Sequence, residues 1–226
     1  MWGVRFKDGD NLEEQKRMIE ILNRLGAEFK PWHPKRKPFL VLVWTVLSQN
    51  TNDRNTKMAF DRLTADFKTP KKIAEANVKT IQKLIKPAGL HQAKSRHLKE
   101  LAQIIITKYK GDLSKVLRKP TEKARSELLT LPGIGYKTAD VLLLFAAGRD
   151  VVPVDTHVAR VSKRLGFAAP ADNREGVRGK LMEVIPPGRK GEAHVLLIQH
   201  GRRYCRARKP LCDHCPVNDL CPKIGL

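Results

Sequence analysis

The sequence predicts an all-α protein, and three observations support this fold class. Apolar residues recur at helical spacing along most of the chain, and the connections between these stretches are short and contain Pro or Gly. No group of neighbouring segments alternates between apolar and polar residues as the strands of a sheet would. At 226 residues the chain is long enough for one large domain or two small ones with a buried core.

The N-terminal part of the chain predicts one amphipathic helix. An apolar stripe runs along it, and Gly26 is expected to end it; the stripe consists of Leu12, Ile19, Leu22 and Leu25. The segment EFKPWHPKRKPF (28–39) contains three prolines and is therefore predicted to be a linker.

From Phe39 onward the chain is expected to be helical almost throughout. The segment FLVLVWTVLSQNT (39–51) is nearly all apolar, which favours a buried helix, although its β-propensity leaves a strand open. Helical periodicity also predicts helices at 54–66, 70–76, 78–85, 92–108, 113–117, 121–129, 137–148, 155–165, 174–184 and 190–200.

The charge of the chain favours a polyanionic partner. Lys and Arg number 44 against 23 Asp and Glu, which gives a net charge of +21. Nucleic acid and an anionic membrane surface are the two candidates. The longest apolar runs, 39–47 and 141–148, are far shorter than the roughly 20 residues of a membrane-spanning helix. The polar N-terminus does not resemble a signal peptide. We therefore expect a nucleic-acid-binding protein without a membrane partner.

All four cysteines lie near the C-terminus, in the pattern C-x6-C-x2-C-x5-C (Cys205, Cys212, Cys215 and Cys221). Two disulfides would suit a secreted protein, which nothing else in the sequence indicates. A zinc site and an iron–sulfur cluster each take four thiolates, and the spacing alone leaves both open. Either metal centre would contribute to the folding of this short tail.

The loop between the first two cysteines, RARKPL, is strongly basic. Arg206, Arg208 and Lys209 are either a solvated charge run or a phosphate-contacting loop. We favour DNA contact, because a loop closed at both ends by metal ligands loses little further entropy on binding.

The segment LPGIG (131–135) lies between the helices predicted at 121–129 and 137–148, which gives a helix–hairpin–helix. Gly133 and Gly135 are expected to permit backbone geometry that a Cβ would forbid. The N-terminus of the second helix then offers N–H groups to a phosphate oxygen without reading a base. A plain connection between two helices is the competing interpretation.

Lys137 follows the hairpin, and Asp155 comes eighteen residues later. Taken singly, Lys137 is one cation among many, and Asp155 is an ordinary helix N-cap. Taken together, they suggest glycosidic cleavage of a nucleotide rotated out of the base stack. A lysine amine with a lowered pKa attacks carbon to form a Schiff base, and a carboxylate beside it accepts a proton and stabilises positive charge on the sugar.

Several segments together resemble the endonuclease III family, the iron–sulfur branch of the helix–hairpin–helix DNA glycosylases. They are LPGIGYKTAD, VDTHVARVSKRLGF, HGRRYC and the cysteine pattern, in this order and spacing. The resemblance runs from about Phe39 to Cys221. It implies two helical domains flanking a DNA-binding cleft. Residues 31–149 would form a six-helix barrel with the helix–hairpin–helix at about 121–148, and residues 1–30 plus 150–226 a domain with a [4Fe–4S] cluster.

The resemblance also implies an activity, that of a base-excision-repair DNA glycosylase with associated lyase activity on damaged, oxidised pyrimidines. Lys137 would attack C1′ and form the Schiff base, Asp155 would assist base departure, and β-elimination would nick the strand 3′ to the abasic site. The partner would be double-stranded DNA containing damaged bases or abasic sites. The enzyme would act as a monomer, associated with the nucleoid in the cytoplasm of a prokaryote, or in the nucleus of a eukaryote.

Three further DNA contacts follow from the resemblance. Gln49 and Asn50, in LSQNTND (47–53), lie where the family fills the gap left by the flipped base. The family often has Gln at the position of Asn50, so either residue is a candidate for that contact. Leu90, in KPAGLHQAK (86–94), corresponds to an apolar wedge between bases, and its competing interpretation is a buried loop residue.

Two alternatives to this function remain. One is a glycosylase of the same superfamily that removes thymine or uracil from G·T or G·U mismatches. That branch tends to carry Tyr at the lysine position, whereas here Tyr136 precedes a retained Lys137. The other is a non-catalytic helix–hairpin–helix protein that grips DNA phosphates.

Overall fold

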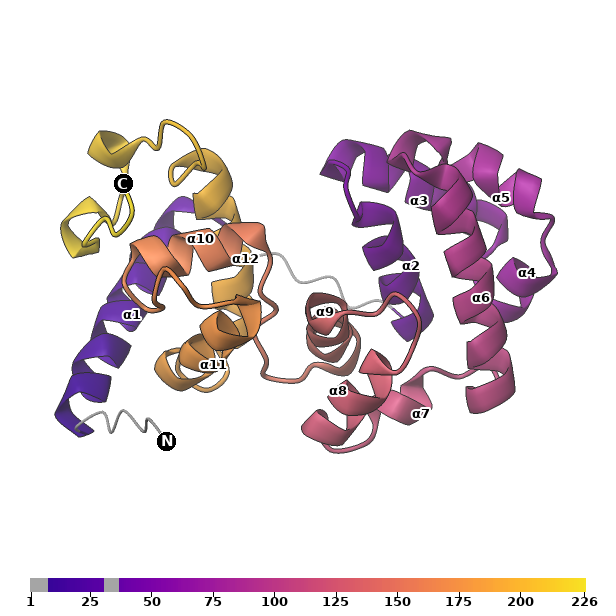
Figure 1. Ribbon diagram of the computed structural model, residues 1–226, viewed down its shortest axis with the longest axis horizontal. Coiled ribbons are helices and arrows are strands. Elements are labelled where there is room, and N and C mark those ends of the chain that lie inside the picture. The colour runs from indigo at the N-terminus through magenta and orange to yellow at the C-terminus, as the bar shows by residue number, and fades with distance from the viewer. Residues whose placement is uncertain (1–7, 31–36) are drawn as a thin grey trace. The chain divides into compact units, whose positions relative to one another are not determined.

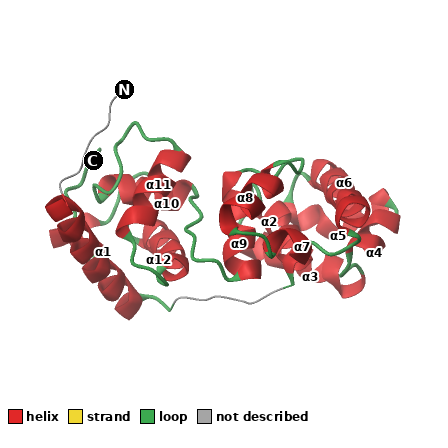
Figure 2. Cartoon of the chain, turned by 90° about the horizontal axis from the view of Figure 1, so that it is seen from below, coloured by secondary structure: helices red, strands yellow, loops and turns green. Residues whose placement is uncertain are grey.

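The computed structural model describes residues 8–30 and 37–226 of the chain. Within these ranges the regular structure is entirely helical, without a strand (Figure 2). The predicted all-α class is confirmed, and every helix predicted between 54–66 and 190–200 is present with its ends shifted by a few residues. No helix in the described part of the chain is both long and apolar enough to cross a membrane.

The described residues fall into two compact units, one of residues 37–149 and one of residues 8–30 with 150–226. The predicted linker before Phe39 falls largely on residues 31–36, which lie outside the described ranges.

The unit of residues 37–149 contains helices α2 to α9 (Figure 1). Six of them are eight residues or longer: α2 (Pro38–Ser48), α3 (Asp53–Asp66), α5 (Val78–Ile85), α6 (His91–Tyr109), α8 (Thr121–Leu129) and α9 (Tyr136–Ala147). Short helices α4 (Pro70–Glu75) and α7 (Ser114–Leu117) and the 3-10 turn η1 (Lys86–Ala88) connect them.

Helix α2 is the centre of this unit. The apolar segment from Phe39 is a helix and not a strand, and most of its side chains are buried. A helix that is apolar on nearly all sides belongs inside a core. α2 packs against α3, α6 and α9, so the helix that follows the hairpin lies directly on the core.

The second unit contains α1 (Asp8–Glu28), α10 (Thr156–Arg164), α11 (Arg174–Val184) and α12 (Lys190–Arg203). Two 3-10 turns, η2 (Cys212–His214) and η3 (Asn218–Leu220), follow near the C-terminus. α1 and α10 each pack against both α11 and α12 around one apolar cluster.

The predicted apolar stripe of α1 is partly wrong. Leu12 and Ile19 are exposed, and the face buried in the core consists of Met18, Ile21, Leu22 and Leu25. These four residues follow the i, i+3, i+4, i+7 pattern, whereas Ile19 lies about 100° around the helix from Met18.

The prediction that Gly26 ends this helix is also wrong. α1 continues to Glu28, and the N–H of Phe29 still donates to the carbonyl of Leu25 at 2.8 Å. A glycine ends a helix by taking a positive φ, and Gly26 is not among the glycines that do so.

A buried ion pair joins the two helices of the hairpin. Arg125 of α8 donates from Nε to Oδ1 of Asp140 at 2.9 Å and from Nη2 to Oδ2 at 3.2 Å. Only 1% of the Asp140 side chain is exposed. The Arg125 guanidinium also lies 4.9 Å from the ring centre of Tyr136. Bidentate geometry of this kind fixes orientation as well as distance, so the pair sets the register between α8 and α9.

Replacing Asp140 with Asn should lower the free energy of unfolding by about 3–5 kcal/mol, because the Arg125 charge stays buried without its carboxylate. Chemical denaturation followed by circular dichroism measures this loss. The matched control is Asp61→Asn, whose pair with Lys57 is exposed (55% and 71% of the two side chains). That control should cost about 0.5 kcal/mol or less. Equal losses in the two variants would contradict the assignment.

Candidate functional site

The hairpin between α8 and α9 presents its backbone to solvent. Leu131 and Ile134 are buried, and the N–H of Ile134 donates to the carbonyl of Leu131 at 3.2 Å, which closes the turn. Gly133 and Gly135 are exposed. The apolar residues of LPGIG therefore anchor the turn, and the glycines form its outer surface.

Gly133 is required at its position for two reasons. Its φ is +66°, a left-handed conformation that costs other residues about 1–2 kcal/mol. A Cβ built on it would lie 2.3 Å from Cε1 of His97. His97 is itself held in place, since its Nε2 lies 2.7 Å from the carbonyl oxygen of Pro132.

The backbone of Gly135 does not require glycine, which corrects the prediction for this position. Its φ is −90°, and a Cβ there would meet nothing within 4 Å. Gly135 is the N-cap of α9, and no side chain caps that end. Its contribution is to leave the first N–H groups of α9 uncovered, at the positive end of the helix dipole.

Lys137 is the second residue of α9 and is partly buried. The three residues after it, Thr138 to Asp140, are buried. The core side of α9 and the Arg125–Asp140 pair therefore fix the helix on which this amine is carried.

Asp155 is the N-cap of α10, in the other unit. Its Oδ1 accepts hydrogen bonds from the N–H groups of His157 and Val158, both at 2.8 Å. Both bonds go to one oxygen, and a carboxylate has a second, so capping is compatible with proton transfer. The buried residues Val151 to Val154 precede it and anchor the start of the helix.

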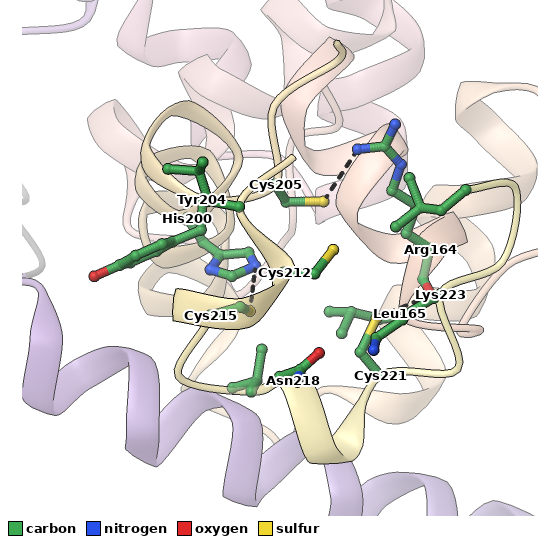
Figure 3. Close-up of a pocket in the computed structure, with 13 residues that line it drawn as sticks. Arg164, Leu165, His200, Tyr204, Cys205, Cys212, Cys215, Asn218, Cys221 and Lys223 are labelled. Carbon is green, nitrogen blue, oxygen red and sulfur yellow. Dashed lines mark hydrogen bonds between the residues drawn. The ribbon is translucent and has the colours of Figure 1, made fainter. Parts of the chain in front are cut away.

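The four cysteines surround one pocket in the unit that contains α10 (Figure 3). All four are free thiols, so the two-disulfide interpretation is wrong. Among the described residues, no three Cys, His, Asp or Glu side chains form a group that would hold a single metal ion. Four thiols placed around a shared space form a donor set that fits a multi-iron cluster.

Nitrogen groups from two helices face the cysteine sulfurs. Arg164 of α10 donates from Nη1 to Sγ of Cys205 at 3.5 Å, and Nε2 of His200 lies 3.8 Å from Sγ of Cys215 (Figure 3). Burial lowers the pKa of His200 to about 4, so its ring is neutral at pH 7. Burial also raises the pKa of the Cys215 and Cys221 thiols. Bound iron and the N–H donor of Arg164 would therefore stabilise the thiolate form of cysteines in this pocket.

The cysteine segment is tied to α10 by two arginines that sequence reasoning missed. Arg160 donates to the carbonyls of Gly201 and Cys205, each at 2.9 Å. Arg164 donates to the carbonyls of Arg206 at 2.6 Å and Ala207 at 3.2 Å. Their i, i+4 spacing on one face of α10 is a sequence signal that was available. Through these bonds the cysteine segment holds the helix that Asp155 caps.

The basic loop after Cys205 is exposed at Arg206, Arg208 and Lys209. Its backbone is held by Arg164, and Lys209 has a left-handed φ of +50°. Three cations thus lie on a loop fixed beside the cysteine pocket.

Gln49 and Asn50 are exposed just after α2, and Leu90 is 59% exposed just before α6. The alternative of a buried loop residue at Leu90 is therefore wrong. The structure brings the four cysteines together with the basic loop, and it brings Gly133, Gly135 and Lys137 together in the hairpin. Lys137 belongs to the unit of residues 37–149, and Asp155 belongs to the other unit.

Comparison with known proteins identifies the family. Residues 43–187 match the model of the HhH-GPD superfamily base excision DNA repair proteins, and residues 205–221 match the iron-sulfur binding domain of endonuclease III. Endonuclease III of Thermotoga maritima is 34% identical over 208 residues, which cover 90% of this chain and 92% of that protein. The chain belongs to the endonuclease III family.

Solved structures agree with this family. A trapped endonuclease III–DNA covalent intermediate, in an estranged-adenine complex, superposes with a TM-score of 0.81 at 33% identity, over 92% of this chain and 96% of that one. A thermostable thymine-DNA glycosylase superposes with a TM-score of 0.80 at 25% identity, over 93% and 96% of the two chains.

This member of the endonuclease III family is an enzyme, a base-excision-repair DNA glycosylase of the class that also cleaves at the abasic site. Its partner is DNA, and its cofactor is a [4Fe–4S] cluster, since the matched iron-sulfur binding domain spans residues 205–221 and contains all four cysteines. The match to the iron-sulfur binding domain excludes the zinc interpretation. The match to DNA repair enzymes excludes a non-catalytic DNA-binding protein. When bound, the cluster would supply iron–thiolate bonds to cysteines of the segment that follows α12, and these bonds would cross-link that segment.

Replacing Gly133 with Ala should destabilise the chain by at least about 1–2 kcal/mol, because the left-handed φ is strained and the Cβ meets His97. Gly135→Ala is the matched control in the same turn. It should cost less than about 1 kcal/mol, the penalty of Ala at an N-cap. Urea denaturation of the two variants measures the difference, and equal losses would show that the turn tolerates a side chain at position 133.

Proposed function

We propose that this glycosylase removes oxidised pyrimidines and cleaves the strand through a Schiff base on Lys137, with Asp155 assisting. The observation that carries the proposal is the position of Lys137, the second residue of α9, directly after the glycine hairpin. It is supported by the 33% identity to an endonuclease III that was trapped as a covalent intermediate with DNA.

The hairpin would hold the substrate by its phosphate. The uncapped N-terminus of α9 offers N–H groups and a positive dipole end, which bind an anion without reading the base. Lys137 belongs to the first turn of the same helix, so a phosphate held there brings the attached deoxyribose toward its amine.

In the proposed reaction the neutral amine of Lys137 attacks C1′ of the flipped nucleotide, and the bond from C1′ to the base breaks. The base leaves with the electron pair of that bond and takes up a proton, and the amine, now bonded to C1′, loses one. The nitrogen lone pair then forms the C1′=N bond as the bond from C1′ to O4′ breaks, so the sugar ring opens and O4′ takes up a proton. Asp155 accepts a proton and stabilises positive charge on the sugar. Loss of a C2′ proton then expels the 3′ phosphate, which nicks the strand, and water releases Lys137.

Other parts of the chain have roles in the same proposal. Residues 37–149 would be the barrel domain, and residues 8–30 with 150–226 the cluster domain. Arg206, Arg208 and Lys209 would contact phosphates, and Gln49, Asn50 and Leu90 would enter the space left by the flipped nucleotide. The enzyme would act as a monomer on double-stranded DNA with damaged bases or abasic sites, in the cytoplasm of a prokaryote.

A second candidate is the removal of thymine or uracil opposite guanine. The similarity to a thymine-DNA glycosylase at 25% identity favours it, and the retained Lys137 favours the first candidate. A panel of duplexes separates the two: faster release of thymine from G·T than of thymine glycol would select the second.

Lys137→Gln should abolish both strand cleavage and the covalent adduct formed with an abasic-site duplex under borohydride, because only an amine forms the reducible imine. Lys123→Gln, at an exposed lysine of α8, is the matched control and should leave the adduct unchanged. An undiminished adduct in Lys137→Gln would refute the assignment.

The substitution Asp155→Asn tests the role of Asp155 in proton transfer. Asn is as good an N-cap as Asp, so α10 should keep its stability while proton transfer is lost. Single-turnover base release should fall about 10²- to 10⁴-fold at an unchanged free energy of unfolding. A normal rate would leave Asp155 as a cap alone.

Arg206→Gln, Arg208→Gln and Lys209→Gln should each flatten the dependence of log Kd on log salt concentration by about 0.9, the contribution of one phosphate contact. Fluorescence anisotropy with a labelled duplex at several salt concentrations measures the slope. A slope equal to that of the wild type in all three variants would place this loop outside the DNA interface.

A further inference from the structure

Lys94, on the first turns of α6, is a buried lysine that the proposed chemistry does not use. The residue is 4% exposed. Its Nζ donates to three backbone carbonyls, those of Leu47 at 2.8 Å, Gln49 at 2.7 Å and Ala88 at 2.8 Å. An ammonium has three N–H groups, so these bonds use its full donor capacity.

The three carbonyls belong to segments that end at this point. Leu47 lies in the last turn of α2, Gln49 is the C-cap of α2, and Ala88 is the last residue of η1. Carbonyls at the end of a helix lack intrahelical partners and carry the negative end of the dipole, which a cation stabilises. Burial lowers the pKa of Lys94, because desolvation disfavours the charged ammonium. The three carbonyls act in the opposite direction and stabilise the ammonium.

The two segments joined by Lys94 carry the exposed residues Asn50 and Leu90 in left-handed conformations, with φ of 53° and 48°. For a leucine this conformation costs about 1–2 kcal/mol and persists only where the surroundings impose it. The side chain of Lys94 holds the loop of Leu90 at Ala88, and the backbone N–H of the same residue makes the ordinary i→i−4 bond to the carbonyl of Leu90 at 2.9 Å.

We infer that Lys94 is a positioning residue, which locks the segment of Gln49 and Asn50 to the loop of Leu90 so that both enter a duplex as one rigid surface. The inference rests on the proposed function in that these side chains are taken to occupy the opened duplex. Lys94 itself does not need to touch DNA. Its effect is to remove the entropy that two independent loops would lose on insertion.

Lys99, on the same helix, provides a matched control. Its Nζ donates to the carbonyl of Ala74 at 2.6 Å and also to that of Ala76, at the end of α4. The interaction is the same, since a lysine donates to carbonyls at the end of a helix. The end of α4, however, carries no residue proposed to contact DNA. The two lysines therefore separate stabilisation of the fold from positioning of the DNA-probing loops.

The test is the preference of the protein for a duplex containing a tetrahydrofuran abasic-site analogue over an intact duplex, measured as a ratio of Kd values. Lys94→Met should lower this preference about tenfold or more, as expected when a rigid arrangement becomes loose. Its Kd for intact duplex should change by less than about twofold, because phosphate contacts dominate that binding. Lys99→Met should leave the preference unchanged even where it lowers the stability.

Lys94→Arg is the second variant, for the case that Lys94→Met does not fold. It keeps charge and donors but places them differently, so it should lower the same preference by a smaller factor. An unchanged preference in the Lys94 variants, or an equal loss in Lys99→Met, would overturn the inference. Neither outcome depends on Schiff-base formation, because both are binding measurements. Schiff-base formation is measured separately, by the borohydride adduct of Lys137.

Discussion

The functional segments of this enzyme depend on hydrogen bonds that basic side chains donate to backbone carbonyls. Lys94 joins the end of α2 to the loop before α6, and Lys99 closes the end of α4. Arg160 and Arg164 attach the cysteine segment to α10. In each case a cation satisfies carbonyls that the end of a helix or a loop leaves without a backbone partner. The loops with proposed roles in DNA binding are thereby fixed before any DNA is present.

This interaction changes how the charge of +21 is understood. A basic composition favours a polyanionic partner, but part of the excess is used inside the fold and is not offered to phosphate. Arg125 is a further case, since its charge is directed at Asp140 within the hairpin. The cations that remain at the surface beside the cysteine pocket, such as Arg208 and Lys209, lie on a loop whose backbone is already held. Such a loop loses little entropy on binding, which favours affinity for phosphate.

The sequence predicted the helices well because their signals are local: apolar periodicity, capping residues and Pro or Gly at the connections. The cysteine spacing and the segment from Pro132 to Lys137 were recognisable for the same reason. The partners of the internal cations were harder to predict, because most acceptors of Lys94 and Arg160 lie more than 40 residues away along the chain. The i, i+4 spacing of Arg160 and Arg164 indicates a shared helix face but not which carbonyls lie opposite it. Gly135 was misjudged because the need for a positive φ cannot be separated, in sequence, from the need for an uncapped helix end.

The proposed mechanism requires a covalent bond between the amine of Lys137 and C1′ of the nucleotide whose base has been removed. Digestion of the borohydride-reduced complex and mass spectrometry of its peptides locate this bond. The added mass of the deoxyribose fragment should lie on the peptide containing Lys137, at that side chain. An adduct on another lysine or on the N-terminal amine, with Lys137 unmodified, would contradict it.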